Sequence, residues 1–98
     1  MGGKIYVTGG LHQGIGSSVN SVYVYDPQAD AWAQMASMGI SRRLHVSAAV
    51  GGKLYVFGGW GTGSQRLSTA EVYDPASDSW APVTSLASAR SSLVAVAL

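Results

Sequence analysis

Short apolar stretches alternate with polar, glycine-rich stretches along the whole chain, and the same order of stretches occurs twice. The phrase GGKIYVTGG at residues 2–10 returns as GGKLYVFGG at residues 51–59. The phrase VYDP at residues 24–27 returns 48 positions later, at residues 72–75. A period of this length is typical of repeat architectures, in which each repeat is one supersecondary unit.

Each repeat predicts four short strands, because β-branched and aromatic residues are bounded by glycines and Asp-Pro turns. The double glycine at residues 51–52 suits a two-residue hairpin turn, since glycine adopts positive φ without strain. We therefore expect an all-β chain of two antiparallel meanders, with repeat 1 over residues 1–50 and repeat 2 over residues 51–98. The expected strands are 4–10, 21–27, 31–35 and 45–50, then 53–59, 69–75, 79–83 and 93–98.

A double glycine after YV, then VYDP, then a Trp about six residues later, then an Arg before an apolar strand resembles the kelch repeat. The resemblance covers nearly the whole chain, twice. It implies that each repeat is one blade of a β-propeller, usually of six blades, with the apolar strand innermost. The positions that carry the motif are Gly9, Gly10, Tyr25, Asp26 and Trp32, and then Gly58, Gly59, Tyr73, Asp74 and Trp80.

The motif residues have structural explanations. The double glycines let neighbouring backbones approach closely. Trp32 and Trp80 are expected to pack between blades, since each covers a large apolar area. Arg42 and Arg90 are expected to anchor backbone carbonyls or to face the mouth of the central channel.

The order in which the strands of the two repeats follow one another predicts that several copies of the chain assemble. Counted by strands, the chain runs from the second strand of one blade to the innermost strand of another. Two blades do not close a ring, and repeat arrays generally need three or more units. We therefore expect residues 93–98 of one chain to complete the first blade of the next, in a head-to-tail contact. Six blades from three chains is the favoured ring, and two or four chains are the alternatives. The register of the ends also suggests an engineered or designed fragment, with a natural two-repeat parent as the alternative.

Composition narrows the function classes. Only 11% of the 98 residues are charged and 47% are hydrophobic, which favours a folded chain over a disordered one. A net charge of +1 argues against nucleic-acid binding. No stretch reaches the length of a membrane span and no signal peptide precedes the first strand, so we expect a soluble, cytoplasmic protein when expressed. The absence of cysteine excludes disulfides, thiolate zinc sites and the Cys-Tyr copper oxidases that the kelch class includes.

No catalytic constellation is recognisable. Four of the five acidic residues lie in the two Asp-Pro turn motifs, where local hydrogen bonding explains them. Neither His12 nor His45 stands at a metal-ligand spacing, so no metal within one chain and no cofactor is expected. Three copies of His45 around the axis of a trimer would be the one arrangement able to hold a metal.

The loops that join the second strand to the third and the fourth strand to the first share one face in kelch propellers. That face commonly contacts partners. Exposed Trp beside Arg is the composition of interface hot spots, although Trp60 folded back over its own blade is the alternative. The candidate partner-binding residues are His12, Gln13, Arg42, Arg43, Trp60, Gln65, Arg66 and Arg90.

Taken together, these patterns favour a self-assembling propeller building block without catalytic activity, whose first partner is itself. The first alternative is an interaction module that binds a protein or an acidic peptide on the loop face. The second alternative is a fragment of a carbohydrate-acting kelch enzyme.

Overall fold

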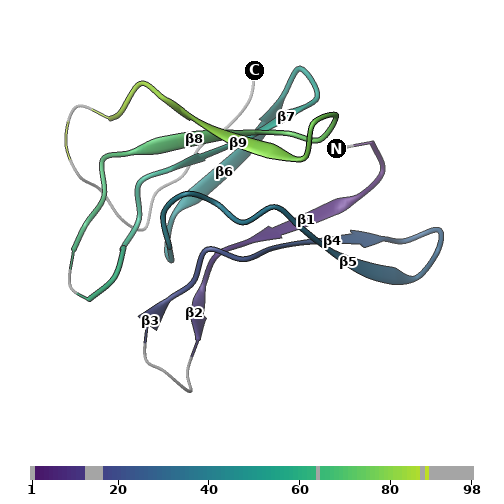
Figure 1. The fold of residues 1–98 in the computed structure, drawn as a ribbon, viewed down its shortest axis with the longest axis horizontal. Helices are drawn as coiled ribbons and strands as arrows, with labels where there is room; N and C mark the ends of the chain where they lie inside the picture. The colour runs from purple at the N-terminus through teal and green to yellow at the C-terminus, as the bar shows by residue number, and fades with distance from the viewer. Residues whose placement is uncertain (1, 13–16, 64, 87, 89–98) are drawn as a thin grey trace.

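The computed structural model describes residues 2–12, 17–63, 65–86 and 88, and it consists of antiparallel strands. Blade 1 is a sheet of three described strands in the order β1-β4-β5, and blade 2 is a sheet of four in the order β6-β7-β8-β9 (Figure 1). The strands are β1 (Ile5–Thr8), β2 (Leu11–His12), β3 (Ser17–Ser18), β4 (Val22–Asp26), β5 (Ala31–Met35), β6 (Val46–Val50), β7 (Lys53–Phe57), β8 (Ala70–Asp74) and β9 (Ser79–Val83).

Seven strands lie where the repeat pattern predicts them. The segment expected to be the innermost strand of blade 2 is β6, which pairs with β7 from Val46 opposite Phe57 to Val50 opposite Lys53. Residues 93–98, expected to be an innermost strand as well, lie outside the described residues.

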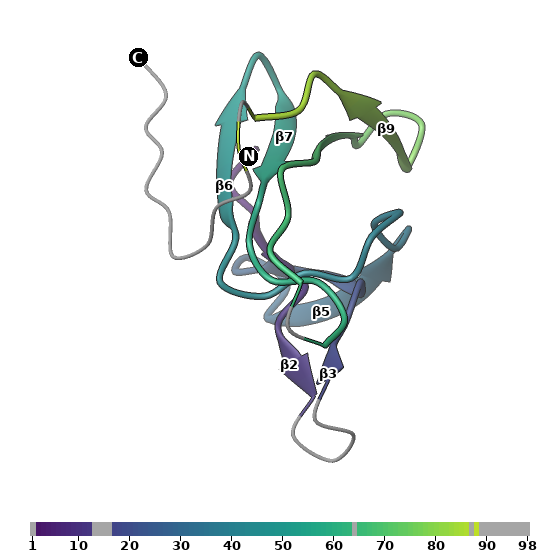
Figure 2. The same ribbon diagram turned by 90° about the vertical axis from the view of Figure 1, so that its left-hand side faces the viewer.

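One element was not predicted. The loop of the first repeat folds back on itself as a short ribbon, in which β2 pairs with β3 through Leu11 opposite Ser18. Figure 2 shows this ribbon projecting away from both sheets.

The turns form for the reasons that the sequence suggests. Gly51 and Gly52 have φ angles of 59° and 76°, the conformation that a two-residue hairpin between β6 and β7 requires. In the Asp-Pro turns, Asp26 Oδ1 accepts a hydrogen bond from the N–H of Gln28, and Asp74 Oδ1 accepts one from the N–H of Ala76, both at 3.0 Å.

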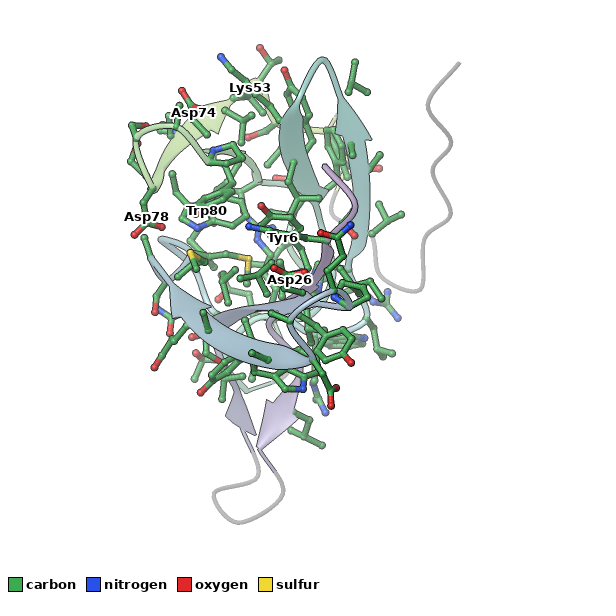
Figure 3. All side chains as sticks on the ribbon, turned by 90° about the vertical axis from the view of Figure 1, so that its right-hand side faces the viewer. Tyr6, Asp26, Lys53, Asp74, Asp78 and Trp80 are labelled. Atoms are coloured by element: carbon green, nitrogen blue, oxygen red, sulfur yellow. The ribbon has the colours of Figure 1, made fainter. Side chains whose placement is uncertain are left out.

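The core lies between the two sheets. Val22, Met38 and Val56 form its buried cluster, against which Met35 and Trp80 pack. Figure 3 shows Tyr6 and Trp80 lying between the sheets. The Trp80 indole also donates a hydrogen bond from Nε1 to the carbonyl oxygen of Ala36, at 2.8 Å, so it bridges blade 2 to blade 1 as predicted.

The opposite face of blade 1 is open. Ile5, Val7 and Trp32 are 56%, 45% and 59% exposed, because no described residue of the chain covers this side of the sheet. Trp32 does not pack between blades within the single chain, and its packing in an assembled ring stays a prediction.

The double glycines permit close approach of the segment that links the two blades. Gly59 has a φ of 93°, and a Cβ atom there would lie 2.6 Å from the carbonyl oxygen of Arg43. Gly9 has a φ of 63°, and a Cβ atom there would overlap the carbonyl oxygen of Arg42. A side chain at either position would separate the backbones that meet there.

Candidate functional site

Arg42 lies in the interior, at the joint between the blades, and its side chain has no exposed surface. Its Nη1 donates to the carbonyl oxygens of Gly58 and Thr69, at 3.0 and 2.9 Å. Its Nη2 donates to Thr69 Oγ1 at 3.0 Å and to Glu71 Oε2 at 3.2 Å. This confirms the prediction that Arg42 anchors backbone carbonyls, and it corrects the placement of Arg42 on a partner-binding face.

Glu71 completes this buried network, and sequence reasoning did not pair it with Arg42. Its two carboxylate oxygens accept hydrogen bonds from the N–H groups of Gly39, at 2.7 Å, and Ile40, at 3.2 Å. The segment that leaves blade 1 is thus tied to β8 of blade 2. Among the described residues, Nε of Arg42 is buried without a hydrogen-bond partner, whereas both of its terminal nitrogens are engaged. Loss of either member of the pair would leave an unpaired buried charge, which costs several kcal/mol.

The next residue, Arg43, takes part in the loop face instead. Its backbone N–H donates to the carbonyl oxygen of Trp60 at 2.9 Å, and the N–H of Trp60 donates to its carbonyl oxygen at 2.8 Å. The guanidinium carbon of Arg66 lies 5.0 Å from the centroid of the Trp60 ring, which is a cation–π arrangement. Arg43, Trp60 and Arg66 together form what we call the arginine–tryptophan cluster.

The cluster carries two guanidinium groups that form no salt bridge with an acidic side chain among the described residues. The carboxylate of Glu71 pairs with Arg42 instead. Arg66 is exposed, Arg43 and Trp60 are half-buried, and Nε of Arg43 is buried without a hydrogen-bond partner. The cluster is therefore positive and partly aromatic, and Nε–H of Arg43 has no partner among the described residues.

The neighbouring loops support this cluster. The Ser18 hydroxyl on β3 donates to the carbonyl oxygen of Gly61 at 2.8 Å, which links the ribbon of the first repeat to the Trp60 loop of the second. Gln65 is exposed beside Arg66, and His12 lies on β2 opposite Ser17. The other two predicted site residues, Gln13 and Arg90, lie outside the described residues.

His45 lies at the inner end of the joint. Its Nε2 is 2.8 Å from Thr8 Oγ1 of blade 1. Its Nδ1 is buried and has no hydrogen-bond partner in the part of the chain that the structure describes. Burial, and to a lesser degree the nearby Arg42 guanidinium, lower the pKa of His45 below its ordinary 6.5, because both disfavour the charged ring.

Every acidic side chain has a structural partner. Asp26 and Asp74 accept backbone N–H groups in their turns, and Glu71 is paired with Arg42. Asp30 and Asp78 each accept a hydrogen bond from a tyrosine hydroxyl of their own blade, Tyr25 and Tyr73 respectively. No group of three or more His, Asp or Glu side chains gathers among the described residues.

Burial and the Asp78 carboxylate raise the pKa of Tyr73, because a phenolate would be desolvated and repelled there. The pKa of Asp78 is lowered, first by the N–H of Ala36 and then by the Tyr73 hydroxyl, because both stabilise the carboxylate. These carboxylates therefore hold strands and turns in place. The tyrosine–aspartate pairs were missed in the sequence, although both repeats have Tyr and Asp five residues apart.

A groove of about 580 Å³ follows the outer side of the joint. Ile40, Trp80 and Pro82 are among the residues that line it. The two carboxylates on its wall, Glu71 and Asp78, are engaged in the bonds between the blades. Over the described residues, no helix has the length and hydropathy that crossing a bilayer requires.

Two antiparallel meanders, stacked face to face with the innermost strand of the second supplied from the end of the first repeat, define neighbouring blades of a β-propeller. The model of the kelch motif matches residues 1–39 and again residues 41–87. The chain belongs to the kelch-repeat family.

The curated relatives are longer proteins. A putative F-box/kelch-repeat protein of Arabidopsis thaliana is 40% identical over 78 residues, which cover 71% of this chain and 22% of the relative. Kelch-like protein 23 of Homo sapiens is 31% identical over 64 residues, which cover 65% of this chain and 12% of the relative. Host cell factor 2 of Homo sapiens is 32% identical over 60 residues, which cover 58% of this chain and 7% of the relative.

Proposed function

We propose that this chain is a self-assembling propeller building block without catalytic activity, and that its assembled loops act as a protein-interaction module. Chains join head to tail, so that blade 2 of one chain covers blade 1 of the next. The observation that carries the proposal is the open apolar face of blade 1, where Ile5, Val7 and Trp32 are exposed.

The equivalent face of blade 2 is the reference for the open face of blade 1. Leu54 and Val56 stand in β7 where Ile5 and Val7 stand in β1, and they are 6% and 0% exposed because blade 1 covers them. A face of the same composition needs a neighbour of the same kind, since an exposed apolar sheet face is a site of association.

The edge of blade 1 supports the same proposal. In blade 2 the second strand, β7, pairs with the innermost strand, β6, whereas in the described part of blade 1 the equivalent strand, β1, pairs with β4 alone. The sequence LVAVAL at residues 93–98 lies 48 positions after the segment that contains β6. We propose that these residues, donated by a second chain, supply the innermost strand of blade 1.

The number of chains in the ring follows from the number of blades that each one contributes. A ring assembled from two-blade units has an even number of blades, and a heterologous contact closes if the rotation fits. We favour six blades from three chains.

Light scattering after size-exclusion chromatography tests the proposal. We expect a mass of three times the 10.1 kDa of one chain. A chain without residues 93–98 is expected to fail to assemble. A mass that stays at one chain over the whole concentration range would overturn the proposal.

A second candidate function is an interaction module that binds an acidic segment of another protein. The arginine–tryptophan cluster favours it, because the Arg66 guanidinium lies over a half-buried indole ring and Arg43 pairs with Trp60 through its backbone. Neither arginine forms a salt bridge with an acidic side chain among the described residues. Relatives that include F-box/kelch-repeat and Kelch-like proteins are consistent with such a module.

Fluorescence anisotropy with a poly-glutamate peptide, and with a poly-glutamine peptide of equal length, tests this second function. We expect binding of the acidic peptide alone, weakened by Arg66→Gln and by added salt. Equal affinity for both peptides would contradict it. Activity on a panel of sugars would contradict the absence of catalysis.

A further inference from the structure

A single residue at the joint, Ala36, is held at both of its backbone polar groups. Asp78 Oδ1 accepts a hydrogen bond from its N–H at 2.9 Å, and Trp80 Nε1 donates to its carbonyl oxygen at 2.8 Å. Both contacts go to the backbone, so the side chain at position 36 is not recognised. We call Tyr73, Asp78 and Trp80 the latch of blade 2.

Blade 1 carries the same latch, already formed. The Tyr25 hydroxyl donates to Asp30 Oδ1 as the Tyr73 hydroxyl donates to Asp78 Oδ1. The rings of Tyr25 and Trp32 lie 5.1 Å apart at 44°, and those of Tyr73 and Trp80 lie 5.1 Å apart at 42°.

The backbone at the latch is also the same in both blades. Asp30 has a φ of 49° and Asp78 has a φ of 48°. In blade 1, however, Trp32 Nε1 donates no hydrogen bond to a described residue, and its side chain is exposed.

The second repeat also carries the segment that such a latch binds. Thr84 follows β9 as Ala36 follows β5, 48 positions earlier, and it is exposed. The chain takes the same course beyond both residues. The N–H of Met38 donates to the carbonyl oxygen of Asn20 at 2.9 Å, and the N–H of Leu86 donates to that of Ser68 at 2.7 Å.

We propose that Asp30 and Trp32 bind the backbone N–H and carbonyl of Thr84 in a second copy of this chain. The inference rests on the proposed self-assembly and names the polar contact that orients it. The second copy is the occupant because its blade 2 ends in the segment that matches the one held inside the chain. A backbone contact accepts threonine where the internal joint has alanine.

The contact between copies also differs from the internal joint in its charged residues. Tyr23 of β4 stands where Glu71 stands in β8, so the acid that pairs with Arg42 has no counterpart in blade 1. Without a buried ion pair, the contact between copies depends more on its latch than the internal joint does.

The experiment uses two substitutions in the full chain, one on each side of the contact. Asp30→Gly removes the carboxylate and keeps the positive φ, which glycine adopts without strain. Thr84→Pro removes the N–H and leaves the carbonyl. Sedimentation equilibrium is expected to show a dissociation constant per joint raised about tenfold or more by each substitution, because each removes a charge-assisted hydrogen bond.

The double variant separates this contact from an unrelated effect. If Asp30 binds the N–H of Thr84, the two substitutions together are expected to weaken association no more than either one alone. Asp78→Gly is the matched control, since it breaks the internal latch and is expected to lower the stability of the chain. Circular dichroism checks that each variant is folded, and hydrogen exchange of the Thr84 amide reports the contact directly in the wild-type assembly.

The outcomes distinguish the two proposals. An assembled wild type in which Asp30→Gly and Thr84→Pro leave the dissociation constant unchanged would overturn the latch and leave self-assembly standing. Additive effects of the two substitutions would also overturn it. A wild type that remains a single chain at every concentration would overturn both, and the open face would then belong to a blade of different sequence.

Discussion

Blades 1 and 2 present nearly the same apolar face in two different environments. Val56 of blade 2 is fully buried and Leu54 is 6% exposed, whereas Val7 and Ile5 at the matching positions of blade 1 are 45% and 56% exposed. The residues are aliphatic in both blades and their strand positions match. The difference shows that the neighbour on that face determines burial in this repeat.

The comparison extends to the aromatic residues. Trp80 and Trp32 stack on a tyrosine of their own blade in nearly identical geometry, yet Trp80 alone reaches a backbone carbonyl of the neighbouring blade. The blade is therefore organised locally, and the joint adds contacts to a structure that already exists.

The largest expected effect is the loss of the buried arginine. Arg42→Ala leaves the Glu71 carboxylate and three oxygen acceptors without their donor. We expect it to lower the free energy of unfolding by about 3–5 kcal/mol, as breaking a buried pair does. Urea denaturation measures the change. Arg66→Ala on the surface is the control, with an expected change within about 0.5 kcal/mol, and equal effects of the two would contradict the assigned burial.

The second comparison is Val56→Ala against Val7→Ala. The first substitution leaves a cavity in the core between the sheets and is expected to cost about 2 kcal/mol. The second removes exposed methyl groups and is expected to leave the stability of the single chain nearly unchanged. Thermal unfolding of both variants at low concentration makes the measurement. If the loss of stability in the Val7 variant grows with protein concentration, Val7 is covered in the assembly and not in the single chain.

The third comparison is Trp80→Phe against Trp32→Phe. Phenylalanine keeps an aromatic ring but has no N–H, so the carbonyl of Ala36 loses its donor in the first variant. We expect a loss of about 1 kcal/mol for Trp80→Phe, the net value of one hydrogen bond. Trp32→Phe is expected to change the association constant and not the unfolding of a single chain. The same loss for both variants in dilute solution would show that Trp32 already has an intrachain partner.

The smallest expected effect is a pH dependence at the inner end of the joint. The pKa of His45 is lowered in the folded chain from its ordinary 6.5. The unfolded state therefore binds the proton more readily, and the contribution of His45 to stability is complete above about 6.5 and is lost as the pH falls below it. His45→Leu, which places the residue found at position 93 of the second repeat, is expected to reduce this dependence. A pH profile of thermal unfolding between about 5 and 8 gives the comparison, and identical profiles for wild type and variant would contradict it.

The strands and turns of both blades are predictable from the sequence because their signals are local. A double glycine with positive φ makes the β6–β7 hairpin, and Asp74 closes its turn through the amide of Ala76, two residues away. The order of apolar and polar positions within a few residues is enough to predict each strand and turn. Because the order occurs twice, each prediction is supported by two copies.

The candidate site was only partly predictable. Arg43, Trp60 and Arg66 were correctly expected on loops, but their mutual contact depends on backbone pairing between segments that lie well apart in the sequence. Arg42 and Arg43 are adjacent and chemically identical, yet the first is fully buried and the second is half-buried. No local pattern separates them, because the buried partner of Arg42 is an acid 29 positions away.

By itself, the sequence determined that this chain consists of two kelch repeats, since the period, the glycines and the Asp-Pro turns require no knowledge of what surrounds them. The tertiary structure alone decided which copy of each repeated residue is covered. Trp80 is held at the joint and Trp32 is exposed on the open face. The physical reason is that strand formation depends on neighbours along the chain, whereas burial and ion pairing depend on the neighbouring blade.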